Sequence, residues 1–246
     1  MKRQALLFLI VLVLLVSCAK GYDHGADEGI ISSLKDACDK VTSSDSYKAK
    51  SFRLEMTFSE EDVTLMYAHG YYEVDLSGDT PYVSATMTQT VLGASSGVKV
   101  EYKNGISTTT VDGVIYSGSV DEEEFFGKMI FVKPFVPEKG YITGIDNLDT
   151  AEGKGYKVYL KNPKDLLFPL IGMDIYETAM IANPNHELMN IKNASISYII
   201  DAGSVKSMTI AFKLYLYETP PYIPGRDVNL EDYMLEIGVN YNVIFQ

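Results

Sequence analysis

Residues 233–245 read YMLEIGVNYNVIF, and every second residue of this stretch carries a large apolar side chain. The apolar positions are Tyr233, Leu235, Ile237, Val239, Tyr241, Val243 and Phe245. A period of two predicts a β-strand with one buried face. A strand of this length spans about 43 Å at about 3.3 Å per residue, whereas strands of globular proteins average about 5–6 residues. Because sheets twist, long strands in one sheet must curl.

The rest of the chain predicts antiparallel partners for this strand. Strand patterns occupy residues 52–58, 63–74, 82–92, 98–102, 106–111, 114–116, 156–160, 194–200 and 205–217. Asn104-Gly105 and Asp112-Gly113 are strong signals for tight hairpin turns. We therefore predict a mainly β (α+β) fold, in which a long-stranded, curved antiparallel sheet forms a half-barrel around an N-terminal helix, with short helices in the middle region.

The N-terminal helix is predicted over residues 27–41, with Asp27 as its N-cap. Apolar residues recur there at helical spacing, at Ile30, Ile31, Leu34, Ala37, Cys38 and Val41. A short helix is expected to begin within residues 121–126, and Pro134 and Pro137 break the stretch that follows. Residues 163–182 form an apolar, interrupted region that is a candidate flap or plug over the sheet.

The first residues carry a predicted export signal. Lys2 and Arg3 precede an apolar run from Ala5 to Val16, which is shorter than the roughly 20 residues of a transmembrane helix. The run ends in Leu15-Val16-Ser17-Cys18. This ending resembles the bacterial lipoprotein signal, and the alternative is an ordinary secretory leader followed by a chance cysteine.

The lipoprotein resemblance implies that Cys18 carries acyl chains such as palmitate and becomes the new N-terminus after cleavage. We therefore expect a signal peptide over residues 1–17, an acylated tether over 18–26 and a single half-barrel domain over 27–246. The membrane would be a partner through lipidated Cys18. The expected location is the cell envelope, on the extracytoplasmic (periplasmic) side of a bacterial membrane.

Composition narrows the classes of function. The net charge is −12, so the surface repels phosphate backbones and nucleic-acid binding is disfavoured. Apolar residues make up 46% of the chain, which disfavours disorder and allows a sizeable core. There are two cysteines, and acylation of Cys18 leaves Cys38 without a disulfide partner or enough companions for a cysteine zinc site. We interpret Cys38 as a buried structural residue, with a reactive thiol as the alternative.

Catalytic signals are weak. Residues 93–97 match the G-x-S-x-G pattern, but a nucleophile elbow needs a following helix and a strand pattern follows here. His69 and His186 have no nearby residues at metal-ligand spacing. We interpret the acidic residues Glu122, Glu123, Glu124, Asp146 and Asp149 as a solvated surface. The prediction is a protein that is not an enzyme, with no catalytic residues, no metal site and no cofactor.

Two local motifs suggest a family. They are Tyr102-Lys103-Asn104-Gly105 and the turn from Ile200 to Met208, which reads IDAGSVKSM. Together with the predicted leader, helix and meander, they resemble the LolA/LprG-like bacterial lipoproteins (the LppX/LprAFG type). This resemblance implies a half-barrel whose apolar concave face binds acyl chains or lipoproteins. The chain departs from that pattern in a proline-rich loop at 219–224 and in the interrupted region at 163–182.

The expected function is a membrane-anchored extracytoplasmic lipoprotein that binds a lipid or other hydrophobic ligand in an apolar concavity. The candidate cavity residues are Leu34, Leu54, Met56, Met87, Phe125, Phe126, Met129, Leu167, Phe168, Met173 and Phe212. The alternative is that these side chains complete the core. The protein would then be a non-enzymatic structural or protein-interaction lipoprotein of the cell envelope with a filled core. The sequence identifies no protein partner.

Overall fold

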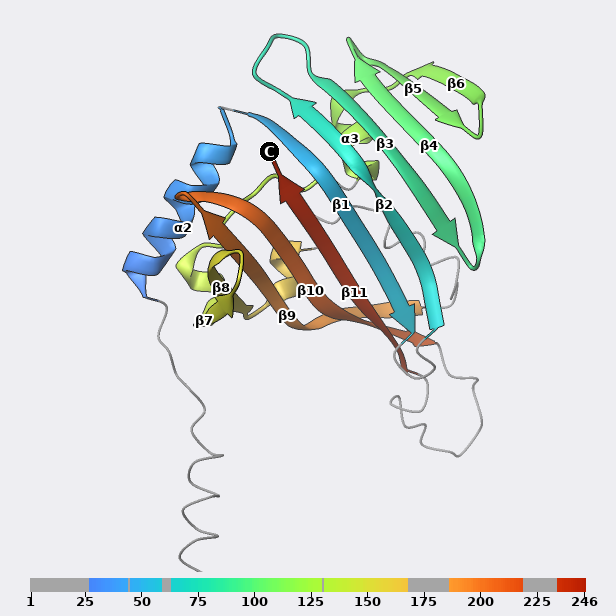
Figure 1. Cartoon of the computed structure of the whole chain (residues 1–246). Coiled ribbons are helices and arrows are strands. Elements are labelled where there is room, and N and C mark those ends of the chain that lie inside the picture. The colour runs from blue at the N-terminus through green and yellow to red at the C-terminus, as the bar shows by residue number, and fades with distance from the viewer. Residues whose placement is uncertain (1–26, 44, 59–62, 130, 168–185, 219–233) are drawn as a thin grey trace, which may run out of the picture.

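Eleven strands form one open antiparallel sheet in the computed structural model, which describes residues 27–43, 45–58, 63–129, 131–167, 186–218 and 234–246 (Figure 1). The strands are β1 (Ser46–Phe58), β2 (Val63–Asp75), β3 (Tyr82–Val91), β4 (Ala94–Lys103), β5 (Ile106–Val111), β6 (Val114–Ser119), β7 (Ile142–Thr150), β8 (Gly153–Leu160), β9 (His186–Asp201), β10 (Ser204–Glu218) and β11 (Met234–Phe245). The helices are α2 (Glu28–Val41), α3 (Glu122–Lys128) and the short 3-10 helix η1 (Lys139–Tyr141). The predicted mainly β fold is confirmed.

The strand order is β6-β5-β4-β3-β2-β1-β11-β10-β9-β8-β7. Two meanders, β1 to β6 and β7 to β10, therefore meet at β11, which pairs with β1 on one side and β10 on the other. The sheet is curved like a half-barrel and does not close, so β6 and β7 are its two edges (Figure 1).

The predicted hairpin turns are present. Asn104 and Gly105 have φ angles of 54° and 72°, and Asp112 and Gly113 have φ angles of 48° and 86°. Left-handed conformation at both central residues is the requirement of a type I′ turn, whose twist matches that of the flanking strands. These turns set the β4–β5 and β5–β6 registers.

Strands β1 and β9 begin earlier than the sequence predicts, because irregularities in strand pairing interrupt the alternation. In β1 the register shifts after Ala49, and the next buried side chain is that of Phe52, three residues on. In β9 the register shifts at Asn193, which has a φ of 53°, between buried Ile191 and buried Ala194. A β-bulge of this kind adds a residue to one strand and breaks its period of two.

Strand β7 was not predicted. Its sequence, ITGIDNLDT, contains a glycine, two aspartates and an asparagine, residue types that are depleted in strands. It pairs along its length with β8, and Ile142 and Ile145 are buried. The expected loop at 219–224, Tyr233 and most of the interrupted region lie outside the described residues, although residues 163–167 are helical.

The N-terminal helix α2 forms as predicted. The Asp27 carboxylate accepts hydrogen bonds from the backbone N–H groups of Gly29 (2.8 Å) and Ile30 (3.3 Å). Such a cap satisfies donors that have no partner within the helix. The apolar side of α2 packs against β10, with Leu34 and Cys38 buried.

The middle of the concave face is covered by residues 131–137, the stretch that the prolines break. The Tyr72 hydroxyl of β2 donates a hydrogen bond to the Val132 carbonyl (3.0 Å), and the Tyr198 hydroxyl of β9 donates one to the Phe135 carbonyl (2.7 Å). Val132, Pro134 and Pro137 are buried. This segment therefore crosses from β2 to β9 and fills space that the single helix leaves open.

Candidate functional site

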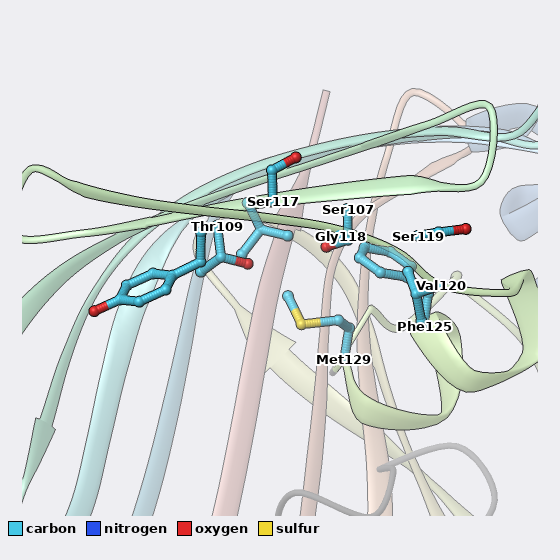
Figure 2. A pocket seen from close by; sticks show the side chains of 10 residues that line it. Ser107, Thr109, Ser117, Gly118, Ser119, Val120, Phe125 and Met129 are labelled. Carbon is cyan, nitrogen blue, oxygen red and sulfur yellow. The ribbon is translucent and has the colours of Figure 1, made fainter.

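A hollow of about 340 Å³, open to solvent, lies where β4, β5 and β6 meet α3 (Figure 2). It is lined by Val100, Ser107, Thr109, Tyr116, Ser117, Gly118, Ser119, Val120, Phe125 and Met129. Ligand-binding pockets usually measure about 300–1,000 Å³. The hollow is therefore large enough for a small apolar molecule or part of one acyl chain.

The strand register explains why this space exists. Across the sheet, Val100 pairs with Thr109 and Thr109 with Tyr116, while Tyr102 pairs with Ser107 and Ser107 with Gly118. Paired residues share a face, so the bulky inward residues Val100 and Tyr102 of β4 give way to the smaller Ser107 and Thr109 on β5 and to Gly118 on β6. The concave face is thus least filled beneath its outermost strands.

Helix α3 forms the opposite wall. The Asp121 carboxylate caps it by accepting a hydrogen bond from the Glu124 N–H (2.7 Å). The Phe125 ring stacks on Tyr102, with ring centroids 4.3 Å apart, and the Phe126 ring meets Phe125 edge-on at 5.3 Å. These contacts hold α3 beneath β4. Met129 follows the helix, and its side chain reaches toward the strands (Figure 2).

Two of the candidate cavity residues, Phe125 and Met129, line the hollow. Phe126 and Met87 are partly buried and pack beside the core. Five others are at most 4% exposed and belong to the continuous core, namely Leu34, Leu54, Met56, Leu167 and Phe212. Phe168 and Met173 lie outside the described residues.

The polar part of the lining was not predicted. Ser107, Thr109 and Gly118 lie in stretches that read ISTTTV and VIYSGS. The signal that could have identified them is the occurrence of small residues at positions 107, 109 and 118, on two strands whose hairpin turns were recognised. The sequence analysis selected large apolar side chains, so it identified Phe125 and Met129 but missed the small residues that leave the space open.

A second hollow, of about 550 Å³, lies along the β7–β8 hairpin and is also open to solvent. Its lining includes Asn147, Asp149 and Lys154, and Leu148 is its one large apolar residue. Such a lining does not favour an apolar ligand.

The G-x-S-x-G stretch is a hairpin. Leu92 and Gly93 form the turn with φ angles of 48° and 84°, and β4 begins at Ala94. The Ser95 hydroxyl shares a hydrogen bond of 2.7 Å with that of Thr90 on the neighbouring strand. The strand-to-helix turn that a nucleophile elbow requires is therefore missing at these residues.

The other reactive groups that the sequence analysis considers are Cys38, His69, His186 and Asp146. Burial raises the pKa of the Cys38 thiol to about 12, with a further contribution from Asp39. His69 is exposed and packs against Tyr67, while the side chain of His186 lies outside the described part of the chain. Asp146 accepts a hydrogen bond from the Tyr159 hydroxyl at 2.9 Å. Over the described ranges, no three His, Cys, Asp or Glu side chains gather as they would around a metal ion.

No protein-family profile and no curated protein sequence matches this chain. Within the part that the structure describes, no helix combines the length and apolar character needed to span a bilayer. The predicted leader and Cys18 lie outside the described residues.

Proposed function

We propose that this protein is a lipid-anchored extracytoplasmic lipoprotein, of LolA/LprG-like type, that binds a lipid or other hydrophobic molecule on the concave face of its sheet. The observation that carries the proposal is the hollow beneath β4, β5 and β6, which the described side chains leave unfilled. Val100, Phe125 and Met129 supply apolar surface there. The leader that ends at Cys18 supports the proposed anchor.

The lining suggests how such a ligand would lie. Each methylene group moved out of water gains about 0.8 kcal/mol, so an acyl chain would occupy the apolar wall beside Phe125 and Met129. The hydroxyl groups of Ser107 and Thr109 are available in the same hollow for hydrogen bonds to a polar group. The five fully packed candidates, Leu34 among them, would support the site from the core rather than contact the ligand.

One observation favours a second function. Residues 131–137 cover the middle of the concave face and are held there by hydrogen bonds from the Tyr72 and Tyr198 hydroxyl groups. A filled centre suits a structural or protein-interaction lipoprotein better than a carrier with a deep cavity. The two functions differ in whether the hollow is occupied.

The test is to fill the hollow. Ser107→Phe places a ring inside it, whereas Thr108→Phe places the same ring on the opposite face of β5, because successive side chains of a strand alternate between the two faces. Full-length protein purified from membranes is extracted with organic solvent, and bound lipid is quantified by mass spectrometry. We expect lipid with the parent and with Thr108→Phe, and a loss of about tenfold with Ser107→Phe. An absence of lipid from the folded parent, or equal lipid in both variants, would contradict the proposal.

The anchor is tested separately. Cys18→Ser removes the sulfur that would receive the diacylglycerol, so we expect the protein to leave the membrane fraction or to remain unprocessed. Because a single acyl chain binds a membrane weakly and two or more hold it firmly, the shift between fractions should be nearly complete. Lys20→Ser, in the same predicted tether, is the control. Normal processing and membrane retention of Cys18→Ser would argue against lipidation.

A further inference from the structure

Strand β6 ends the sheet, and one of its edges has no strand partner among the described residues. The Val120 N–H donates to the Gly105 carbonyl at 3.0 Å, and β5 pairs with β6 in continuous register. In an antiparallel pair, alternate residues direct their backbone groups to the same neighbour. Val114, Tyr116 and Gly118 therefore face β5, and the N–H and C=O groups of Ile115, Ser117 and Ser119 face outward.

This edge lacks the features that usually protect an edge strand. Its sequence, VIYSGS, contains no charged residue and no proline, and Val114, Ile115 and Tyr116 are 54%, 68% and 60% exposed. Edge strands are normally blunted by charges, prolines or bulges, because a bare edge pairs with other chains. The opposite edge follows that rule, since β7 carries Asp146 and Asp149.

A strand added to β6 would also extend the wall of the hollow. Tyr116 and Gly118 line the hollow, so alternate side chains of an added strand would lie beside Tyr116 on the concave side. Peptide recognition by strand addition has this form, in which main-chain hydrogen bonds give affinity and pockets for alternate side chains give specificity.

The charges around β6 indicate the chemistry of the partner. Asp121, Glu122 and Glu123 are exposed immediately beyond its C-terminal end, and Asp112 precedes it. A second copy pairing antiparallel through this edge would bring Asp112 of each copy toward Asp121 of the other, and each copy carries a net charge of −12. Like charges oppose that arrangement, whereas basic residues would be attracted to the acidic end.

We infer that the free edge of β6 binds an extended segment of a partner protein, antiparallel to β6, with uncharged alternating side chains and basic residues at its N-terminal end. This inference goes beyond the proposed lipid binding, since it assigns a protein ligand to the edge rather than an apolar ligand to the hollow.

The probe is a synthetic peptide with two lysines followed by Val–Thr repeats. The matched control is the same peptide in which the backbone amides that would face β6 are N-methylated. Methylation removes the N–H groups that would donate hydrogen bonds to β6. Binding to the full-length protein in detergent is measured by fluorescence anisotropy, and hydrogen exchange is followed across residues 114–119. We expect the first peptide to bind and to slow exchange across β6, and the methylated peptide to do neither.

The matched protein variants are Ile115→Pro and Ile115→Val. Proline removes the outward N–H of residue 115 but no bond to β5, whereas valine keeps the N–H and the β-branched shape. We expect Ile115→Pro to bind the peptide about tenfold more weakly, since a hydrogen bond is worth up to about 1.5 kcal/mol, and Ile115→Val to bind as the parent does.

Three results would overturn the inference. The first is that the lysine-containing peptide does not bind the parent protein, and the second is that Ile115→Pro binds this peptide as tightly as the parent does. The third is that the parent protein is a dimer in analytical ultracentrifugation and that Ile115→Pro converts it to a monomer, which would make the edge an interface between two copies. Ile115 does not line the hollow, so bound lipid measured in the same preparations reports on the lipid-binding proposal independently.

Discussion

The carboxylate of Asp75 joins the end of β2 to the start of β1. It accepts hydrogen bonds from the Ser46 hydroxyl (2.6 Å), the Ser77 hydroxyl (2.5 Å) and the Ser77 N–H (2.9 Å). These donors stabilise the ionised form and lower the pKa of Asp75 to about 2, from an ordinary value of 3.8. A single side chain thus joins the two strands at the open end of the β1–β2 hairpin.

Asp75 should make stability depend on pH in the acid range. A carboxyl group whose pKa is depressed by folding stabilises the protein above pH 3.8, and that contribution is lost as the pH falls through about 2. We expect Asp75→Asn to be less stable than the parent at pH 7 and to lose less stability between pH 4 and 2, measured by urea unfolding. Asp79→Asn, on an exposed residue nearby, is the control. Parallel pH curves for Asp75→Asn and the parent would contradict this role.

At this scale the sequence predicts which side chains face inward better than it predicts what they contact. Alternation correctly placed Leu54 and Met56 on the buried face of β1. The sequence pattern could not show that Leu54 and Met56 belong to the core whereas Phe125 and Met129 line the hollow. That distinction depends on which side chains pack opposite each residue. Phe125 and Met129, for example, share their hollow with Ser107 and Thr109 of β5, which are too small to fill it.

At the scale of elements, two tyrosines hold residues 131–137 against the sheet. Burial raises the pKa of Tyr72 and of Tyr198 well above the ordinary value, so both hydroxyl groups remain protonated donors. Their acceptors, the carbonyls of Val132 and Phe135, belong to a segment without regular structure, and its backbone cannot satisfy itself as a strand or helix does.

Removing either hydroxyl should therefore loosen this segment. We expect Tyr72→Phe and Tyr198→Phe each to lower the free energy of unfolding by about 1–2 kcal/mol, because each removes a hydroxyl that donates a hydrogen bond to the backbone of this segment. Hydrogen exchange at residues 131–137 should become faster. Tyr159→Phe, which removes an exposed hydrogen bond to Asp146, is the control and should change stability by less than about 0.5 kcal/mol. Equal effects of all three substitutions would show that the segment is held by other contacts.

Elements with an uninterrupted period of two were predicted almost to their ends, as β3 and β11 illustrate. The failures have a common physical cause, since β1 and β9 contain bulges and β7 is paired despite a polar sequence. In each case pairing with a neighbouring strand determines the structure, and that neighbour is not visible in the local pattern. The turns at Asn104 and Asp112 were predictable because their requirement for positive φ is local.

At the scale of the whole molecule, β11 joins the two meanders. It pairs with β1 from Phe58 to Ala49 and with β10 from Tyr217 to Ser207. Val243 and Ile237 of this strand are fully buried. The hydrophobic core on the concave face is therefore continuous only while β11 is present.

Removing residues 234–246 should abolish the folded state rather than weaken it. Both neighbouring strands would lose a partner, and the loss of five buried side chains, at about 1.5–3 kcal/mol each, is as large as the roughly 5–15 kcal/mol stability of a typical domain. We expect the truncated chain to show no cooperative thermal transition by circular dichroism. A chain that begins at residue 27 keeps every described strand and is the control. A truncated chain that unfolds cooperatively at the parental temperature would contradict the central role of β11.

The position of β11 also bears on the timing of biosynthesis. A ribosome makes β1 early and β11 only after the other ten strands, yet these two lie side by side. Until residues 234–245 emerge, hairpins can form on either side but have nothing to unite them. The nascent polypeptide can thus complete its sheet only after its last strand has been made.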